Sequence, residues 1–186
     1  MRPQKIDDVQ LMNNLLEIIR NKGYAGSSLN DLAKATGLKK ASLYHRFPGG
    51  KEEITLAVLN FASGLVDKEI ISLLKNRELD AVKRLKLALK NISKYYDNGK
   101  KSCLSHTLST ETGWPVLTEI INESTNKWIG AFTLVGLDLG FHFNEAEDMA
   151  LDTQIRIQGS LLLSKNKDSL DAFEKTIRRI EKMYLT

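Results

Sequence analysis

The chain has 186 residues, of which 42% are hydrophobic and 27% are charged, so it can bury the core of a globular protein. Its longest apolar runs are only a few residues, which excludes a membrane-spanning helix and a secretory signal core, and we expect a cytoplasmic location. The single cysteine excludes an internal disulfide framework.

The net charge of +4 is unevenly distributed along the chain. Of the 27 Lys and Arg and the 23 Asp and Glu, eight and four lie within residues 1–50, which leaves 19 of each for the rest. A positive excess at one end is typical of a surface that binds a polyanion, although an excess this small also arises by chance.

Helical periodicity predicts an all-α fold of about nine helices. In each segment apolar residues recur every three or four positions, and glycine or proline separates several of the segments. The predicted helices lie around residues 11–19, 29–36, 39–47, 54–65, 85–96, 103–109, 115–137, 144–163 and 169–184.

The segment from Ser28 to Phe47 predicts a helix-turn-helix. Ser28 can cap the first helix, and Asp31 lies where it completes a capping box. Gly37 permits the positive φ that the tight turn needs. The second helix has an apolar side and a side with hydrogen-bond donors suited to phosphates and base edges. These donors are Lys39, Lys40, Ser42, His45 and Arg46.

The chain resembles the TetR/AcrR family of transcriptional regulators around this motif. The matching residues are Lys22-Gly23-Tyr24, Ser27-Ser28, Asp31-Leu32-Ala33, Gly37-Leu38, the segment Lys40–Tyr44, Phe47 and Lys51. The insertion Phe47-Pro48-Gly49-Gly50-Lys51 resembles the LmrA/YxaF-type branch, and so does Gln158–Leu163. Lys39 departs from the pattern, because a serine or threonine usually caps this helix and a lysine opposes its dipole.

The resemblance implies a DNA-binding repressor that a small-molecule ligand releases from its operator. It implies a three-helix DNA-binding domain over residues 1–48 and a helical ligand-binding and dimerisation domain over residues 49–186. The predicted DNA contacts are Ser28, Lys39, Lys40, Ser42, Tyr44, His45, Arg46 and Lys51, with Ser28 and Lys51 at phosphates. Alternatively, Tyr44 belongs to the core, His45 is a solvated surface residue and Lys51 is a surface charge.

The C-terminal half supplies candidates for a ligand pocket. Cys103, Trp114, Trp128 and Phe132 are apolar side chains that could line a cavity, although aromatic residues at helical spacing also form ordinary cores. A helical small-molecule carrier and a thiol-responsive sensor are therefore the alternative functions. A carrier alone leaves the N-terminal motif unexplained.

Catalysis is not expected. Cys103 and His106 lie three residues apart, near Glu111, which is conceivable as a nucleophile with its base or as half of a metal site. No second pair of ligands stands at metal spacing, and cysteine is usually a buried apolar residue. We therefore predict no enzyme activity, no metal and no cofactor.

The last two predicted helices provide surfaces for a homodimer. In the final helix Phe173, Ile177, Ile180 and Tyr184 form a stripe. The helix before it has two stripes, which are Ala146, Ala150, Ile157 and Leu161, and Leu151, Ile155, Gly159 and Leu162. A helix that is apolar on two sides needs two partners, and the resemblance favours a symmetric four-helix interface between two chains. Alternatively, both stripes pack within one subunit.

Overall fold

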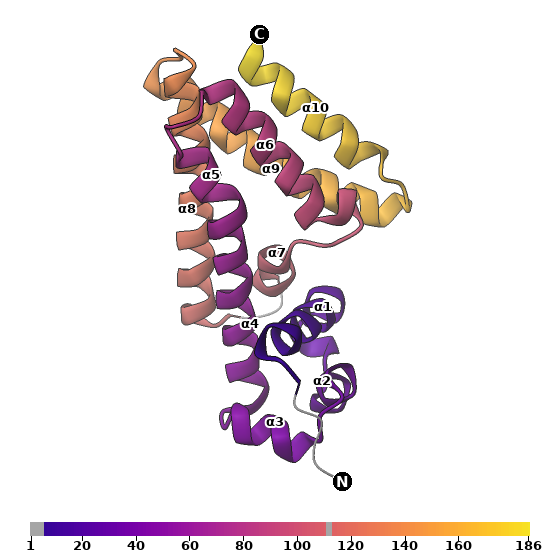
Figure 1. The fold of residues 1–186 in the computed structure, drawn as a ribbon. Helices are drawn as coiled ribbons and strands as arrows, with labels where there is room; N and C mark the ends of the chain where they lie inside the picture. Colours follow the sequence, from indigo (N-terminus) through magenta and orange to yellow (C-terminus); the bar gives the residue numbers. More distant parts are fainter. Residues whose placement is uncertain (1–5, 111–112) are drawn as a thin grey trace. The chain divides into compact units, whose positions relative to one another are not determined.

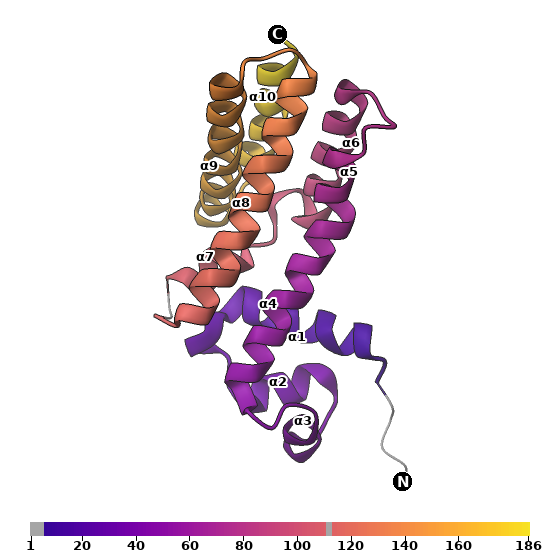
Figure 2. The same cartoon turned by 90° about the vertical axis from the view of Figure 1, so that its left-hand side faces the viewer.

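The computed structural model describes residues 6–110 and 113–186, and within these ranges it is helical, with no β-strand (Figures 1 and 2). The helices are α1 (Asp8–Gly26), α2 (Leu29–Thr36), α3 (Lys40–Arg46), α4 (Gly50–Val66), η1 (Asp67–Ile71), α5 (Ser72–Lys75), α6 (Ala81–Tyr95), η2 (Asp97–Gly99), α7 (Leu104–Ser109), α8 (Pro115–Asp138), α9 (Phe143–Lys167) and α10 (Asp171–Leu185). The predicted all-α fold is confirmed.

The segment from α4 to α5 is one uninterrupted helix with a wider turn inside it. The backbone stays right-handed helical at Val66, Ile71 and Ser72, and η1 is a π-helical turn in which the Ser72 N–H donates to the Asp67 carbonyl five residues earlier. When this run counts as one helix, the described residues contain nine α-helices, as the periodicity predicts.

The described chain forms two compact units. The first comprises the chain up to Ser63 together with Leu104–Ile120, and the second comprises Gly64–Cys103 together with Ile121–Thr186. This grouping differs from a division at residue 48, because α7 packs against α1 and joins the first unit. The functional boundary between residues 48 and 49 stays a prediction.

The first unit is built on α1, α2 and α3, with α2 packed against both of the others. Leu15, Ile19, Leu32 and Leu43 are fully buried, so each helix presents an apolar side to the interior. The order of these helices and the turn between α2 and α3 are those of a helix-turn-helix.

The second unit has a larger core, to which α6, α8, α9 and α10 contribute. Figures 1 and 2 show α9 and α10 side by side, and α10 also packs against α6. Buried residues from these helices include Leu85, Phe132, Ile157 and Ile180. Among the described residues no helix is both long and apolar enough to cross a membrane.

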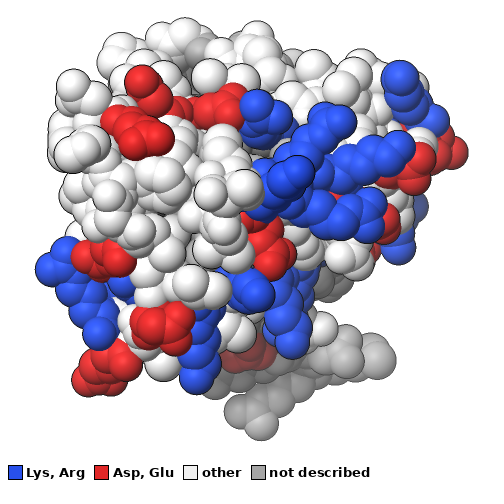
Figure 3. Space-filling model, turned by 90° about the horizontal axis from the view of Figure 1, so that it is seen from above, with Lys and Arg blue, Asp and Glu red and all other residues white. Residues whose placement is uncertain are grey.

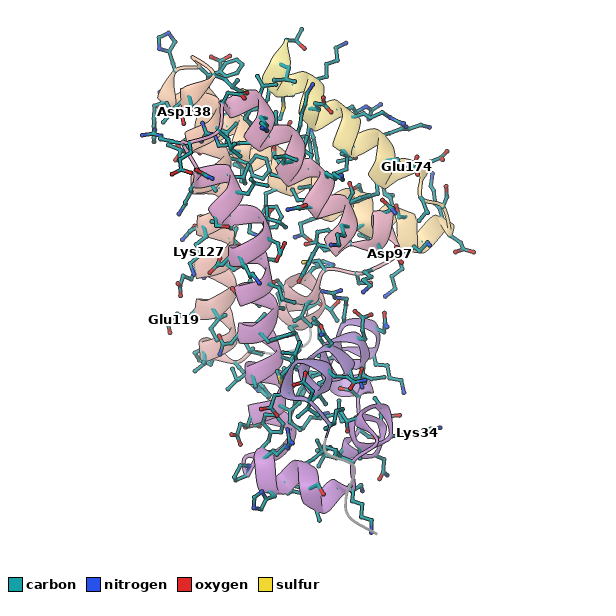
Figure 4. The ribbon with its side chains drawn as sticks, in the orientation of Figure 1. Lys34, Asp97, Glu119, Lys127, Asp138 and Glu174 are labelled. Carbon is teal, nitrogen blue, oxygen red and sulfur yellow. The ribbon has the colours of Figure 1, made fainter. Side chains whose placement is uncertain are left out.

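An ion-pair cluster around the buried Arg84 joins three elements of this unit. The Arg84 side chain is only 2% exposed, and it donates to the Leu74 carbonyl at 2.8 Å and to the Asp138 carboxylate at 2.7 Å. Arg77 donates to the same carboxylate at 3.0 and 3.2 Å. Figure 4 labels Asp138, the last residue of α8. The hydrogen bonds from the two guanidinium groups hold the pKa of Asp138 below its usual range, although partial burial opposes them.

Candidate DNA interface

The capping box at the start of α2 is present. The Ser28 hydroxyl oxygen accepts from the Asp31 N–H at 3.1 Å, and the Asp31 carboxylate accepts from the Ser28 N–H at 3.0 Å. Lys22 also donates to Asp31 at 2.8 Å. The hydrogen bonds from Lys22 and Ser28 hold the pKa of Asp31 well below its usual range. The start of α2 is therefore fixed by local polar contacts.

The turn between α2 and α3 depends on Gly37. This residue has a φ of 67°, the left-handed conformation that glycine adopts without a steric penalty. Its N–H donates to the Lys34 carbonyl, and the Leu38 N–H donates to the Ala33 carbonyl, which completes the end of α2. The turn fixes the direction in which α3 leaves.

Helix α3 is buried on one side and open on the other. Leu43 is fully buried, whereas Tyr44 is 47% exposed, so Tyr44 is not a core residue. Of the predicted contact residues, Lys39, Lys40, His45 and Arg46 are exposed and Ser42 is half-buried. Lys39 precedes the helix without a side-chain capping bond, as expected for a lysine at this position.

Arg46, at the end of α3, is held by the first helix of the same unit. Its guanidinium lies 2.6 Å from the carboxylate of Asp8, which is 87% exposed. An ion pair this open to solvent is weak, so a phosphate can compete with Asp8 for the guanidinium. Asp8 was not predicted as a partner of Arg46, because the two residues are 38 positions apart in the sequence.

Lys51, in the first turn of α4, contacts the end of α1. Its ammonium donates to the Tyr24 carbonyl at 2.7 Å and lies 4.0 Å from the centre of the Tyr24 ring. Nearby, the Glu53 carboxylate accepts from the Gly49 N–H at 2.7 Å and caps this helix. Glu53 was not predicted as a capping residue, although its four-residue distance from Gly49 is a signal visible in the sequence.

Three of the four candidate ligand-binding residues belong to one core, and the fourth belongs to the other unit. Trp114 belongs to the first unit, where its ring meets the Tyr24 ring edge-on at 4.6 Å between centroids. Trp128 and Phe132 stack in the core of the second unit at 6.1 Å between centroids, and Cys103 is a buried residue of the same core. Trp114 therefore packs within the first unit, whereas the other three residues belong to the core of the second unit.

Cys103 accepts a hydrogen bond from the Gln158 side-chain amide at 3.3 Å. His106 is exposed, and Glu111 lies outside the described residues. Within residues 6–110 and 113–186 no three His, Cys, Asp or Glu side chains are grouped closely enough to hold a metal ion. Nothing in this arrangement supports the nucleophile and base that the spacing in the sequence allows.

An open hollow of about 370 Å³ lies on the second unit, between α8 and the start of α9. Its lining is mainly apolar and includes an amide, a hydroxyl and a carboxylate. The lining residues are Asn126, Ile129, Gly130, Thr133, Leu134, Leu137, Phe143 and Glu147. None of the candidates Cys103, Trp114, Trp128 and Phe132 is among them.

The second unit also carries cationic side chains on its surface. Lys83, Lys86, Lys90 and Lys94 are exposed on one side of α6, a helix without any Asp or Glu. Figure 3 shows a group of Lys and Arg side chains close together on the viewed face. The zero net charge beyond residue 50 therefore conceals a local positive excess, which counting along the sequence does not reveal.

The comparisons with known proteins agree with this geometry. Residues 12–58 match the family model of the bacterial regulatory proteins of the tetR family. The chain is 26% identical to the transcriptional regulator YxaF of Bacillus subtilis, over 86% of this chain and 85% of YxaF. It is 24% identical to the regulator LmrA of the same species, over 83% of this chain and 84% of LmrA. A TetR transcriptional regulator of Legionella pneumophila has the same fold, with a TM-score of 0.83, 20% identity and 98% of each chain covered.

The helix-turn-helix and these matches support a DNA-binding transcriptional regulator of the TetR family, and the solved structure has the same fold. The similarity to YxaF and LmrA extends far beyond the DNA-binding segment, which supports a regulator of the LmrA/YxaF type.

Proposed function

We propose that the protein represses transcription and that a small-molecule ligand releases it from its operator. The observation that carries the DNA-binding part is that Lys39, Lys40 and His45, in α3 or directly before it, are exposed while Leu43 anchors the helix in the core. A short helix with one anchored side and one cationic side suits the major groove. Ser28 and Lys51 contact the flanking phosphates in this proposal.

The direct test measures binding to a fragment of the gene's own promoter by fluorescence anisotropy at several salt concentrations. Lys40→Ala should weaken binding about tenfold and lower the salt slope by about one unit. The matched control is Lys165→Ala, which replaces an exposed lysine of α9 and should leave the affinity and the salt slope unchanged. Equal affinity of the Lys40 variant and the wild-type protein would contradict the assignment of α3.

Regulators of the TetR family bind DNA as dimers, and we propose an interface centred on α9. The stripe of Ala146, Ala150, Ile157 and Leu161 is buried in the chain's own core. The other stripe faces outward, with Leu151 46%, Ile155 60% and Leu162 47% exposed. Gly159 belongs to the outward stripe and has no neighbouring atoms within 4 Å of the position that a Cβ would occupy. This apolar face is suited to a second copy of the same helix.

The last helix contributes differently from the sequence prediction. Its stripe packs within the chain, since Phe173, Ile180 and Tyr184 are buried and Ile177 packs against the same core. The outer side of α10 is charged, so α10 can contribute a polar rim rather than an apolar seam.

The oligomeric state tests the proposed interface. Ile155→Asp places a charge on the outward side of α9 and should reduce the mass measured by light scattering from twice to once the 20.9 kDa of the chain. Val82→Asp changes an exposed apolar residue of α6 and should leave the mass doubled. Ile157→Asp is a poor test, because Ile157 is fully buried and its replacement unfolds the chain.

We further propose that the effector is a small apolar molecule bound by the second unit, with the hollow beside α8 as its first candidate site. A screen for thermal stabilisation identifies ligands, and DNA release identifies effectors among them. Coupling between two sites is reciprocal, so operator DNA must weaken effector binding by the same factor. Gly130 lines the hollow and has open space around the position of a Cβ, so the side chain of Gly130→Leu can fill the hollow. This variant should lose effector binding and keep DNA binding. Unchanged effector affinity in this variant would exclude the hollow.

The proposal includes a cytoplasmic location and no catalytic activity. Burial of Cys103 and its contact with Gln158 give no support to a reactive thiol. A carrier without a DNA-related role is not favoured, because it leaves the helix-turn-helix without a purpose.

A further inference from the structure

The ammonium of Lys51 is held by one residue in two ways. It donates a hydrogen bond to the Tyr24 carbonyl at 2.7 Å, and it lies over the Tyr24 ring at 4.0 Å from the centroid. An ammonium has three N–H donors, so the carbonyl leaves two that can reach a phosphate. The contact with Tyr24 therefore restrains the lysine without exhausting its donors.

The Tyr24 carbonyl lies at the end of α1, just after a break in the regular helical backbone. Gly23 has a φ of 71° and a ψ of −177°, which interrupts the regular helical path just before Tyr24. The Tyr24 carbonyl then accepts from the Ser27 N–H at 3.3 Å and from the Ser27 hydroxyl at 3.2 Å, in addition to Lys51. Tyr24 lies in the last turn of α1, where carbonyls lack the regular intrahelical partner, so its carbonyl can accept from a neighbouring side chain.

The Tyr24 ring is held in turn by Trp114. The two rings meet edge to face at 4.6 Å and 73°, the arrangement that aromatic quadrupoles favour. The Trp114 carbonyl accepts from the Thr118 N–H at 3.1 Å, so Trp114 directly precedes the first turn of α8. Burial and the Glu52 carboxylate raise the pKa of Tyr24, so the ring remains a neutral phenol beside the lysine.

We propose that Tyr24 and Trp114 are positioning residues that hold the Lys51 ammonium ready for a DNA phosphate, an inference that rests on the proposed phosphate contact of Lys51. A free lysine loses side-chain freedom when it binds, whereas this lysine is already restrained. Trp114 precedes α8, so the phosphate anchor is tied to the position of the start of that helix. Trp114 thereby has a role that differs from the predicted lining of a ligand pocket.

A double-mutant cycle on operator affinity tests the proposal. Lys51→Ala should weaken binding about tenfold and lower the salt slope by about one unit. Trp114→Leu and Tyr24→Leu should each weaken binding about three- to fivefold in the wild-type background and have no further effect in the Lys51→Ala background. Tyr24→Phe keeps both the ring and the carbonyl, so its affinity should stay within twofold of wild type.

The outcomes distinguish failure of the proposed phosphate contact of Lys51 from failure of the positioning role of Tyr24 and Trp114. If Lys51→Ala leaves the affinity unchanged, the proposed phosphate contact fails and the positioning role fails with it. If Lys51→Ala weakens binding but the Trp114→Leu effect persists in the Lys51→Ala background, only the positioning role is overturned. Circular dichroism on every variant identifies loss of folding.

A second measurement does not depend on the stability of the Trp114 variants. In a Trp128→Phe background Trp114 is the sole tryptophan, because the chain has two. Saturating operator DNA should then shift the emission of Trp114. In the Lys51→Ala variant, with enough additional DNA to saturate the weaker binding, this shift should be absent. An equal shift in the Lys51→Ala variant would overturn the link between the two residues.

Discussion

The polar contacts at the start of α2 and those around the buried Arg84 differ in how far apart in the sequence the partners lie. In the first unit Ser28 and Asp31 are three positions apart, and Lys22 and Asp31 are nine apart. In the second unit Arg84 and Asp138 are 54 positions apart, and Lys127 and Asp67, which contact each other at 3.1 Å, are 60 apart. The start of α2 is therefore specified by local sequence, whereas the ion pairs of Arg84 and Lys127, like the contacts of Arg46 and Lys51 in the first unit, depend on the folded chain.

This contrast predicts the largest effect at Asp138. Asp138→Asn should destabilise the second unit by about 3 kcal/mol, because it leaves the buried Arg84 guanidinium without its counter-charge. The free energy of unfolding is measured by urea denaturation, monitored by the fluorescence of Trp128 in a Trp114→Phe background. Asp152→Asn removes the more exposed ion pair with Arg156 and should cost no more than about 0.5 kcal/mol.

The same variant has a defined pH dependence. The pKa of Asp138 is lowered in the folded protein, so its contribution is present above the unfolded pKa of about 3.9 and is lost as the pH falls through the folded value. The stability difference between wild type and Asp138→Asn should therefore be constant near pH 7 and shrink below about pH 4. A difference that grows on acidification would contradict the assigned ion pair.

Gly99 tests a second long-range contact. It has a φ of +99°, and a Cβ there would lie 2.7 Å from the Cβ of Phe173. Gly99→Ala should therefore destabilise the second unit by about 2 kcal/mol, measured by the same unfolding experiment. Gly64→Ala, in α4 with open space around it, should instead be neutral or stabilising by up to about 1 kcal/mol. Equal effects of the two substitutions would show that the close approach to Phe173 carries no cost.

In the first unit the corresponding test removes a local contact. Ser28→Ala abolishes the capping hydrogen bond to the Asp31 N–H and should destabilise the unit by about 1 kcal/mol, measured through Trp114 fluorescence in a Trp128→Phe background. Ser28→Thr keeps the capping oxygen and should retain most of the stability. If Ser28→Ala costs as much as Asp138→Asn, the contrast between these two sets of contacts does not hold.

The smallest expected effect has the opposite sign. Lys39→Ser places a capping side chain before α3, where the lysine makes no such bond, and should stabilise the first unit by about 0.5 kcal/mol. The same change removes a cation from the proposed DNA-facing side, so operator affinity should fall. A variant that is more stable and also binds DNA as tightly as wild type would remove Lys39 from the proposed interface.

The contrast also explains what could be predicted from the sequence. The helix-turn-helix was predictable because its caps and turn use residues with specific local roles, namely Ser28, Asp31 and Gly37. The nine helices were predictable from periodicity. The periodicity did not predict which apolar stripe of α9 faces the core. Ile157 and Ile155 are the same residue type in the same helix, and only the packing of the rest of the chain buries the first and exposes the second.

The candidate DNA contacts were predictable as a set, but not the intramolecular partners that hold them. Asp8 and Tyr24 lie 38 and 27 positions from Arg46 and Lys51, and nothing local in the sequence connects them. The assignment of Trp114 to a ligand pocket rested on composition, and composition does not distinguish a cavity wall from a ring packed against Tyr24.

The wide turn in the helix that runs from α4 to α5 has a consequence for the history of the chain. A hydrogen bond that spans five residues accommodates one residue more than a regular turn, so η1 is what a single-residue insertion produces when the helix absorbs it. We therefore expect relatives that have a regular helix here to be one residue shorter between the positions of Gly50 and Lys75. Asn91 donates to the Glu69 carbonyl at 2.6 Å, which satisfies an acceptor within the widened turn and so favours its retention.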